Sequence, residues 1–229
     1  GHFDALVAAG DISLGGSDPV GCVDLLREVG AIAVYGNTDR YLTEPDNPPP
    51  DELHLKKWDH LRAQVDWALH RLGDERVSWL RMLPFSLRFS PPPDFNDDLL
   101  IFHGNPQNVI DFIFPPPEQQ PAYFDKVLQP DEDNDLAKLM QGVTAKICAF
   151  GHMHITSTRK WRDYTLVNVA PCSMPALDKD PRARYTIFDW KNDCWQINRK
   201  YVEYDYRQEV AALQASGIPF VEDFIQTFP

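Results

Sequence analysis

Long apolar runs are missing from this sequence of 229 residues, and none approaches the roughly 18 consecutive apolar residues that a membrane-spanning helix needs. The first residues also lack the basic stretch and short apolar run of a secretory signal. Basic residues are outnumbered, with 22 Lys and Arg against 34 Asp and Glu, so the formal net charge is −12. Such a charge repels the phosphates of long nucleic acids. We therefore expect a soluble, cytoplasmic protein that binds neither a membrane nor a long nucleic acid.

Cysteines are few and far apart. The four cysteines, Cys22, Cys148, Cys172 and Cys194, form no Cys-x-x-Cys pair, which argues against a zinc knuckle or a dithiol redox motif. We interpret them as free thiols in a reducing compartment, with Cys148 a small apolar residue inside a buried strand. Internal repeats and low-complexity tracts are also missing. With 43% hydrophobic residues, the chain has enough apolar side chains for a single globular domain, which we place over residues 1–229.

The first part of the chain alternates between strand and helix patterns. The apolar run Ala5–Ala9 is typical of a buried strand, and Ala31–Tyr35 is typical of a second one. Between them, Asp18-Pro19 has the form of a helix start, an N-capping acid followed by proline in the first turn, and we expect this helix to end near Gly30. Strand, helix and strand in succession predict parallel pairing, so the predicted fold class is α/β.

The remainder of the chain adds a helical segment and more strands. Apolar residues at three- and four-residue steps predict a helical insertion at about residues 51–82, which we expect to shape a lid over the substrate. Its histidines, His54, His60 and His70, are interpreted as solvated or locally satisfied side chains rather than ligands. Further strands are predicted at 99–102, 145–150, 165–169, 184–189 and 194–201, with helices at 135–141 and within 208–227. The later strands follow one another without helices, which favours antiparallel pairing there.

Four of the predicted strands end in the same way, with a glycine beside a side chain that can bind a metal. The endings are Gly10-Asp11, Gly36-Asn37, His103-Gly104 and Gly151-His152-Met153-His154. Ligand sites form at the carboxyl ends of strands in open α/β sheets, so these side chains are expected to converge. Glycine lets the backbone turn sharply and approach an ion or a phosphate closely. An isolated Gly-Asp or Gly-Asn pair is more often an ordinary turn, and the prediction depends on the ordered set.

The types of ligand indicate the chemistry of the site. Imidazole nitrogens suit Zn, Fe, Mn or Ni, and carboxylate or amide oxygens extend the preference to harder ions, so the mixture indicates two divalent transition-metal ions. A two-metal site about 3.5 to 4 Å across holds a phosphate and stabilises both oxygens of an in-line displacement. Hydrolysis of a phosphate ester is therefore the expected reaction.

In their order, these motifs resemble those of the calcineurin-like metallophosphoesterases, and the small bacterial and archaeal phosphodiesterase-like branch in particular. The family signature runs Asp-x-His, Gly-Asp, Gly-Asn-His-Asp/Glu, His-Gly and Gly-His-x-His. Four of these five blocks are present in order, and the resemblance covers nearly the whole chain, extending to the turn at Asn168–Ser173. It implies a four-layer αββα sandwich.

The resemblance also implies a role for each matching residue. The implied ligands are Asp11, which bridges both ions, Asn37, His103 and His152, which complete one ion, and His154, which binds the other. Asp39 is expected to join the catalytic residues by orienting the motif through hydrogen bonds. A metal-bound hydroxide is then expected to attack phosphorus, without a covalent intermediate on the enzyme.

The sequence departs from the family pattern in two places. The Asp-x-His block is missing, and we expect its strand to precede Gly1 in a longer chain. Thr38 stands where many relatives carry a histidine that assists the leaving group, although some members of the small bacterial branch lack it too. Substrates whose leaving groups need little protonation, such as nucleotide or aryl diesters, are therefore favoured over alkyl monoesters.

Residues near the motifs allow more than one interpretation. Arg40 either binds a substrate phosphate or forms a surface ion pair, and Asn105 and Ser173 either line the substrate cleft or cap a loop. The expected substrate is a small phosphorylated molecule, and the sequence carries no prediction of oligomeric state. The alternative function is that of a degenerate relative, which binds phosphate or a nucleotide with one metal ion or none. Metal stoichiometry separates these functions, since two ions per chain favour the enzyme.

Overall fold

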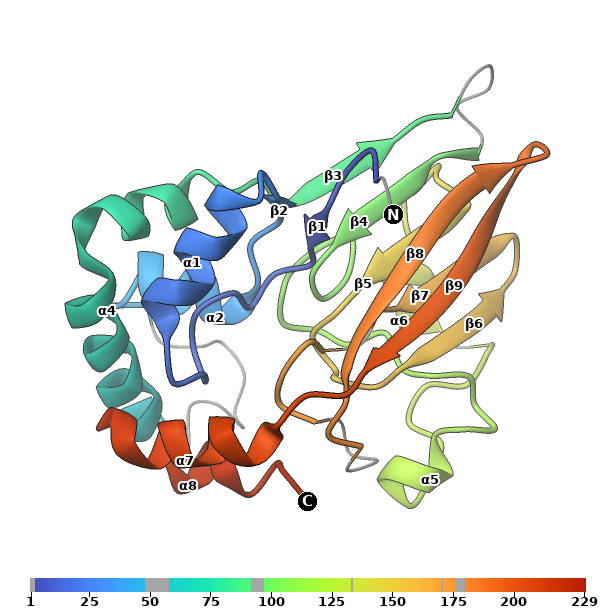
Figure 1. Cartoon of the computed structure of the whole chain (residues 1–229). Helices are drawn as coiled ribbons and strands as arrows, with labels where there is room; N and C mark the ends of the chain where they lie inside the picture. The colour runs from blue at the N-terminus through green and yellow to red at the C-terminus, as the bar shows by residue number, and fades with distance from the viewer. Residues whose placement is uncertain (1–2, 48–57, 92–96, 133, 170, 176–179) are drawn as a thin grey trace.

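The computed structural model describes residues 3–47, 58–91, 97–132, 134–169, 171–175 and 180–229. Strands occupy one side of the molecule, and the first and last helices of the chain gather on the other (Figure 1). The fold begins with β1 (Val7–Ala8) and β2 (Ile32–Ala33), a parallel pair joined by helix α1 (Pro19–Glu28). This is the α/β opening that the sequence predicts.

Helix α1 begins where its sequence indicates. The Asp18 carboxylate accepts a hydrogen bond from the backbone N–H of Gly21 at 2.9 Å, and Pro19 occupies the first turn, where no donor is needed. Together with α2 (Asn37–Thr43) and α4 (Trp58–Arg81), this helix surrounds an apolar cluster. The buried members of the cluster are Val23, Tyr41, Leu42, Val65, Ala68, Leu72 and Leu80.

Helix α4 is the described part of the predicted helical insertion, of which residues 51–57 and His54 lie outside the described residues. Its helical backbone is interrupted at Gly73, where φ is +66°, so the segment consists of two helices end to end. His60 stacks on the ring of Phe220 with centroids 3.6 Å apart, and His70 is exposed. Neither histidine belongs to the metal-binding group described below.

A five-stranded sheet forms the centre of the molecule. Its strands, in the order in which they neighbour one another, are β3 (Ser86–Phe89), β4 (Leu99–Phe102), β5 (Ile147–Phe150), β7 (Tyr164–Asn168) and β6 (Ser157–Trp161). The three inner strands are parallel, and each outer strand is antiparallel to its neighbour. The sequence pattern predicts the inner strands but not β3 or β6. In β6, Arg159 occupies a buried position where an alternating strand normally carries an apolar residue.

The rest of the described chain adds a hairpin and four further helices. The hairpin consists of β8 (Ala183–Lys191) and β9 (Cys194–Val202), which pair in antiparallel fashion as predicted. The helices are α5 (Pro121–Phe124), α6 (Asn134–Leu139), α7 (Tyr206–Ser216) and α8 (Glu222–Ile225). No helix within the described part of the chain combines the length and the apolar character required to cross a membrane.

The two faces of the central sheet bury different layers. Because successive side chains of a strand point to opposite faces, Ile101 and Ala149 lie on one face, while Phe102 and Cys148 lie on the other. The first face packs against β1 and against the β8–β9 hairpin, and the second packs against α6. The result is a layered α/β sandwich of the kind that the family resemblance implies, with β1 and β2 in one layer and β4 and β5 in the next.

Candidate metal centre

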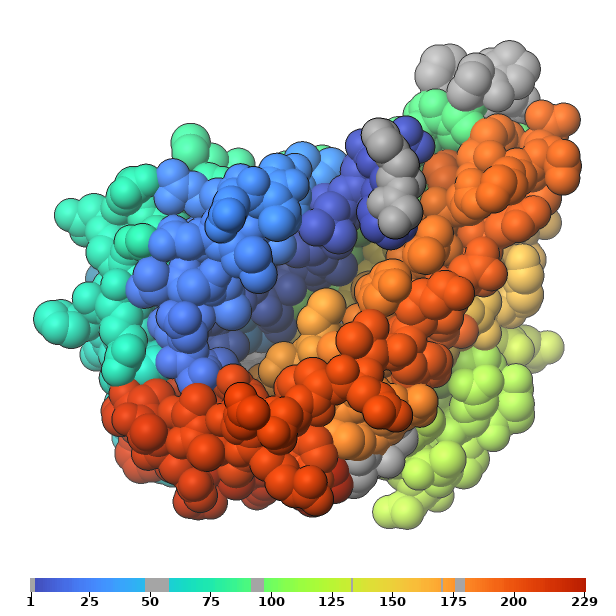
Figure 2. Space-filling model, in the orientation of Figure 1, coloured from blue at the N-terminus to red at the C-terminus, as the bar shows by residue number. Residues whose placement is uncertain are grey.

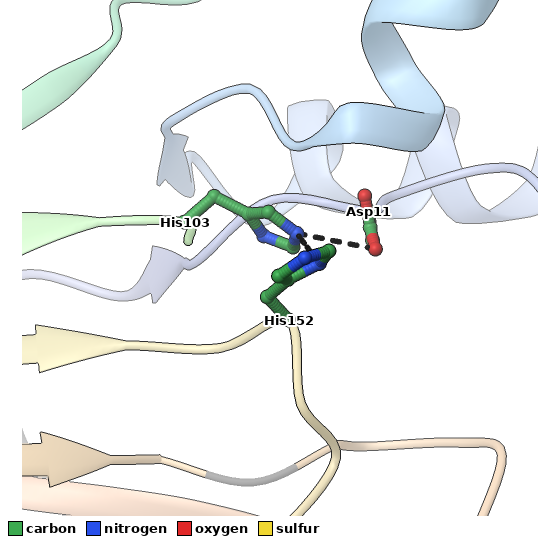
Figure 3. Close-up of side chains that lie close together, drawn as sticks. All are labelled: Asp11, His103 and His152. Atoms are coloured by element: carbon green, nitrogen blue, oxygen red, sulfur yellow. Dashed lines mark hydrogen bonds and ion pairs between the residues drawn. The ribbon is translucent and has the colours of Figure 1, made fainter. Parts of the chain in front are cut away.

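The side chains that follow β1, β2, β4 and β5 converge where two β layers meet. Figure 3 shows Asp11, which follows β1, together with His103, which follows β4, and His152, which follows β5, and these three side chains point toward one another. Asn37, the first residue of α2, places its side-chain oxygen 3.1 Å from Nε2 of His103. The structure thus brings together four of the predicted ligands, and it draws them from two sheets rather than from the edge of one.

Two glycines allow this close approach. A β-carbon at Gly10 would lie 2.6 Å from Nδ1 of His103, and one at Gly36 would lie 2.2 Å from Oδ1 of Asp11. Both distances are well below the roughly 3.5 Å at which nonbonded atoms attract each other. Gly10 also has a φ of +87°, which glycine adopts without strain. A larger residue at either position would force the neighbouring backbone or the ligand side chain to move.

Thr38 and Asp39 hold Asp11 in place. Oδ1 of Asp11 accepts hydrogen bonds from the backbone N–H of Thr38 at 3.0 Å and from its hydroxyl at 2.9 Å. The buried carboxylate of Asp39 accepts hydrogen bonds from the backbone N–H groups of Asp11 (2.8 Å), Ile12 (3.0 Å) and Gly36 (2.8 Å). Asp39 therefore ties the end of β1 to the start of α2, and Oδ2 of Asp11 faces His103.

Backbone carbonyl groups orient the two imidazole rings. Nδ1 of His103 lies 2.7 Å from the carbonyl oxygen of Ala9, and Nε2 of His152 lies 2.8 Å from the carbonyl oxygen of Ile110. Since a carbonyl oxygen only accepts hydrogen bonds, each of these nitrogens carries a proton. In the neutral rings, the lone pairs of Nε2 of His103 and Nδ1 of His152 then face the centre of the group.

Four acceptor atoms therefore meet at the centre. Nε2 of His103 lies 3.2 Å from Oδ2 of Asp11, 3.1 Å from Oδ1 of Asn37 and 3.2 Å from Nδ1 of His152. Two ligand atoms that are each about 2.1 Å from one metal ion stand about 3.0 to 3.4 Å apart in octahedral or tetrahedral geometry. The spacing and the mixture of nitrogen and oxygen donors fit a divalent transition-metal ion.

Burial and charge determine the protonation of these groups. Burial acts to raise the pKa of Asp11, but the charge and hydrogen bond of His103 outweigh it and hold that pKa well below its usual range. Burial works against a charge on His103, whereas Asp11 raises the pKa of its ring. Burial lowers the pKa of His152 to about 4, and burial together with Asp11 raises the pKa of Asp39 to about 6. The group therefore favours one positive charge at its centre, either a proton on His103 or a metal ion.

Three of the predicted ligands have a left-handed backbone conformation. The φ angle is +55° at Asp11, +65° at His152 and +56° at His154. Residues with a β-carbon are uncommon in this region, although Asp and His enter it more readily than most. Strained conformations of this kind cluster at functional sites.

The other predicted residues lie outside the central group. His154 has its Nδ1 atom 3.3 Å from the carbonyl oxygen of Met174, and burial lowers its pKa. Arg40 is exposed and forms an ion pair with Glu44 at 3.2 Å, which is the surface pairing named above as one of its two interpretations. Asn105 is fully buried, and Ser173 is exposed.

Some contributions to the site are not evident in the sequence. The carbonyl groups of Ala9 and Ile110 orient the histidines, but every residue has a carbonyl group, so the sequence offers no signal for them. The ring of Phe112 stacks on His152, with centroids 4.5 Å apart and an interplanar angle of 13°. Thr38 does leave a signal in the sequence, which is a hydroxyl side chain directly after the Gly-Asn pair. In the structure this hydroxyl donates to Asp11.

Comparisons with known proteins support this interpretation. The sequence model of the calcineurin-like phosphoesterase family matches residues 1–156, which include the five predicted metal ligands. No curated protein matches the sequence. A hypothetical protein from Pyrococcus horikoshii OT3 is similar in structure, with a TM-score of 0.72 and 17% identity. The match covers 98% of this chain and 84% of the Pyrococcus chain. A metallophosphoesterase from Sphaerobacter thermophilus has a TM-score of 0.66 and 20% identity, with coverage of 100% and 90%. The chain therefore belongs to the calcineurin-like phosphoesterase family.

Proposed function

We propose that this protein hydrolyses an ester of a small phosphorylated substrate in the cytoplasm, with phosphodiesters or nucleotide-like molecules favoured, at a site for two divalent transition-metal ions. Family membership supports a metal-dependent phosphoesterase in general terms. The observation that carries the proposal is that Asp11, Asn37, His103 and His152 turn their acceptor atoms toward one centre. A cation at this centre is suited to binding a phosphate group.

The residues present fit the ligand set of one ion and contribute to a second. Asp11, Asn37, His103 and His152 would hold the first ion, and Asp11 and His154 would contribute to holding the second. When bound, the ions supply Lewis-acid chemistry, which activates a water molecule and neutralises the charge of the phosphate. Mn, Fe, Zn and Ni all suit this mixture of nitrogen and oxygen ligands.

The chain's own side chains prepare the site before a substrate arrives. Asp39 and Thr38 fix the Asp11 carboxylate, and backbone carbonyl groups fix both imidazole rings. Such support maintains the orientation of metal ligands and strengthens their binding. Little reorganisation is then needed when charge develops on the phosphate oxygens.

Thr38 supports the preference for particular leaving groups. Its hydroxyl donates to Asp11 at 2.9 Å, and a hydroxyl is a poor acid in any case, so this position supplies no proton to a departing alkoxide. Aryl and nucleotide diesters, which leave as more stable anions, are therefore the favoured substrates. Alkyl monoesters hydrolysed faster than aryl diesters would contradict this preference.

The test is hydrolysis of bis(4-nitrophenyl) phosphate with Mn²⁺, Zn²⁺, Ni²⁺ or Fe²⁺ added to the protein. Replacing the central carboxylate in Asp11→Asn is expected to lower the rate on the order of a hundredfold or more. Asp135→Asn is the matched control, because this aspartate is exposed on α6 with 77% of its side-chain surface accessible. Equal rates for the two variants would refute the assignment of Asp11.

A second function, phosphate or nucleotide binding around a single ion, is favoured by one observation. His154 is not part of the group formed by Asp11, His103 and His152. Elemental analysis of the purified protein distinguishes the two functions. Two ions per chain together with turnover support the enzyme, while one ion per chain and no turnover with any of the four metals support the binding module.

A further inference from the structure

The segment from Asn105 to Phe112 packs directly against His152. The carbonyl oxygen of Ile110 accepts the Nε2–H of His152 at 2.8 Å, and the ring of Phe112 lies nearly parallel to the imidazole. The hydrogen bond determines which ring nitrogen faces Asp11 and His103. The stacked ring determines the plane in which that nitrogen points.

Asn105 builds the turn that presents the Ile110 carbonyl. Its Oδ1 atom accepts hydrogen bonds from the backbone N–H groups of Gln107 at 2.8 Å and Asn108 at 3.0 Å. Its Nδ2 atom donates to the side chain of Asn108 at 3.2 Å and to the carbonyl of Asp111 at 2.8 Å. With no exposed surface and with both ends of its amide used inside the turn, Asn105 acts on the turn rather than on a substrate.

Phe112 is itself held from behind. Its ring meets Phe114 edge-on, with centroids 5.9 Å apart, and its carbonyl oxygen accepts a hydrogen bond from the buried Gln129 at 3.5 Å. Phe114 packs in turn against Phe124 at 5.4 Å. The stack on His152 is therefore backed by a chain of contacts that lies outside the metal-binding group.

We propose that Phe112 and Asn105 are positioning residues, which keep the Nδ1 lone pair of His152 directed at the site shared by Asp11 and His103. The inference rests on the metal-dependent function proposed above. The torsion that rotates an imidazole ring is broad, so the contacts of the ring, rather than its rotamer, must fix the direction of Nδ1. Without the Phe112 ring, His152 keeps its hydrogen bond to Ile110 but loses the contact that fixes the orientation of its imidazole plane. His152 then binds a metal ion less well.

A titration with Co²⁺, in which the visible absorbance of the bound ion measures binding, tests this proposal. Phe112→Leu is expected to weaken Co²⁺ binding about tenfold, the lower end of the effect of residues that support metal ligands, and to alter the absorption spectrum. Phe112→Tyr keeps the ring and is expected to restore both. Asn105→Ala is expected to weaken Co²⁺ binding in the same direction, because it loosens the turn that carries Ile110.

Phe114→Leu is the matched control. It removes an aromatic ring of the same size two residues further along the chain, but this ring packs on Phe112 and Phe124 rather than on His152. Its Co²⁺ affinity is expected to fall less than that of Phe112→Leu, because Phe114 reaches His152 only through Phe112. Circular dichroism verifies the fold of each variant, and Phe112→Met, which fills a similar volume without a planar ring, replaces Phe112→Leu if the latter fails to fold.

His152→Ala separates failure of this inference from failure of the proposed function. If His152→Ala weakens Co²⁺ binding and Phe112→Leu does not, the positioning role is overturned while the metal site stands. If neither change affects Co²⁺ binding, or if the unaltered protein binds no Co²⁺, the metal-dependent function falls and the inference falls with it. Weaker binding in Phe112→Leu, restored in Phe112→Tyr and reduced less in Phe114→Leu, supports the proposal.

Discussion

Two buried polar clusters of this protein differ in how their donors and acceptors are matched. Around Arg159 on β6, each guanidinium nitrogen donates to an oxygen: Nε to Asp131, Nη1 to the side chain of Gln129, and Nη2 to the carbonyls of Gln129 and Pro130. The neighbouring Gln120 also uses both ends of its amide. Around His103, by contrast, lone pairs of Asp11, Asn37 and His152 face a ring nitrogen that is itself an acceptor in the neutral state.

The difference shows which cluster needs an added positive charge, which either a proton on His103 or a metal ion supplies. Burial does not separate them, since Arg159 and His103 are each only 1% exposed. The matching of donors to acceptors does separate the two clusters. A cluster in which every donor meets an acceptor is complete, whereas acceptors that face one another are stabilised by an added positive charge. We therefore interpret the Arg159 cluster as part of the structure and the His103 cluster as a functional site.

The largest effect is expected from breaking the matched cluster. Arg159→Met leaves the buried side chain of Gln129 and the carbonyls around it without their donor, and the free energy of unfolding is expected to fall by about 3 kcal/mol. Urea denaturation measures this loss, which should be similar with and without Mn²⁺. Lys138→Met is the control, because that lysine side chain is 74% exposed and its ion pair contributes less than about 1 kcal/mol. Equal stability of the two variants would contradict the structural role of Arg159.

A smaller effect is expected from blocking the unmatched cluster. Mn²⁺ at about one hundred times its dissociation constant should raise the free energy of unfolding of the unaltered protein by about 2.7 kcal/mol. Gly36→Ala should abolish this increase, because the new β-carbon would lie 2.2 Å from Oδ1 of Asp11. Gly16→Ala should retain it, since a β-carbon there meets no atom within 4 Å. Thermal melts of the three proteins with and without Mn²⁺ decide the matter, and a full Mn²⁺ response in Gly36→Ala would refute the assigned site.

The smallest expected effect is a difference in alkylation between two cysteines, and it concerns the apolar core that lies between the two clusters. This core includes Phe102 and Phe150, which directly precede site motifs, as well as Trp161, which lies beside the Arg159 cluster. Cys148 lies within it, and burial raises the pKa of its thiol to about 12. The reactive thiolate is therefore not formed between about pH 7 and pH 10, and iodoacetamide should spare Cys148 while it modifies the exposed Cys194.

Mass spectrometry of the alkylated protein locates the modified cysteines. In the folded protein, Cys194 should be modified and Cys148 should stay unmodified throughout this pH range. In urea, both should react. Modification of Cys148 under native conditions would show that water and reagent reach the core, and would contradict the burial of its thiol.

The sequence predicts most of what local pattern can encode. Helix α1 follows from Asp18-Pro19, and the ligand-bearing strand ends follow from apolar runs that stop at glycine, because these signals lie within a few residues of one another. That the four ends belong to two facing sheets depends on pairing between distant segments, which periodicity does not record. Strand β6 is hidden for a related reason, since Arg159 interrupts its pattern and its partners lie 28 to 45 residues away in the chain.

At Asp11, His152 and His154, the left-handed backbone conformation means that a substitution which would stabilise the fold is also one that would remove a predicted ligand. Glycine would relieve conformational strain of about 1 kcal/mol at such a position, so these are places where a search for heat-resistant variants would find gains. Each gain would remove a predicted ligand. Selection for stability alone would therefore favour variants that keep the fold and lose the predicted ligands.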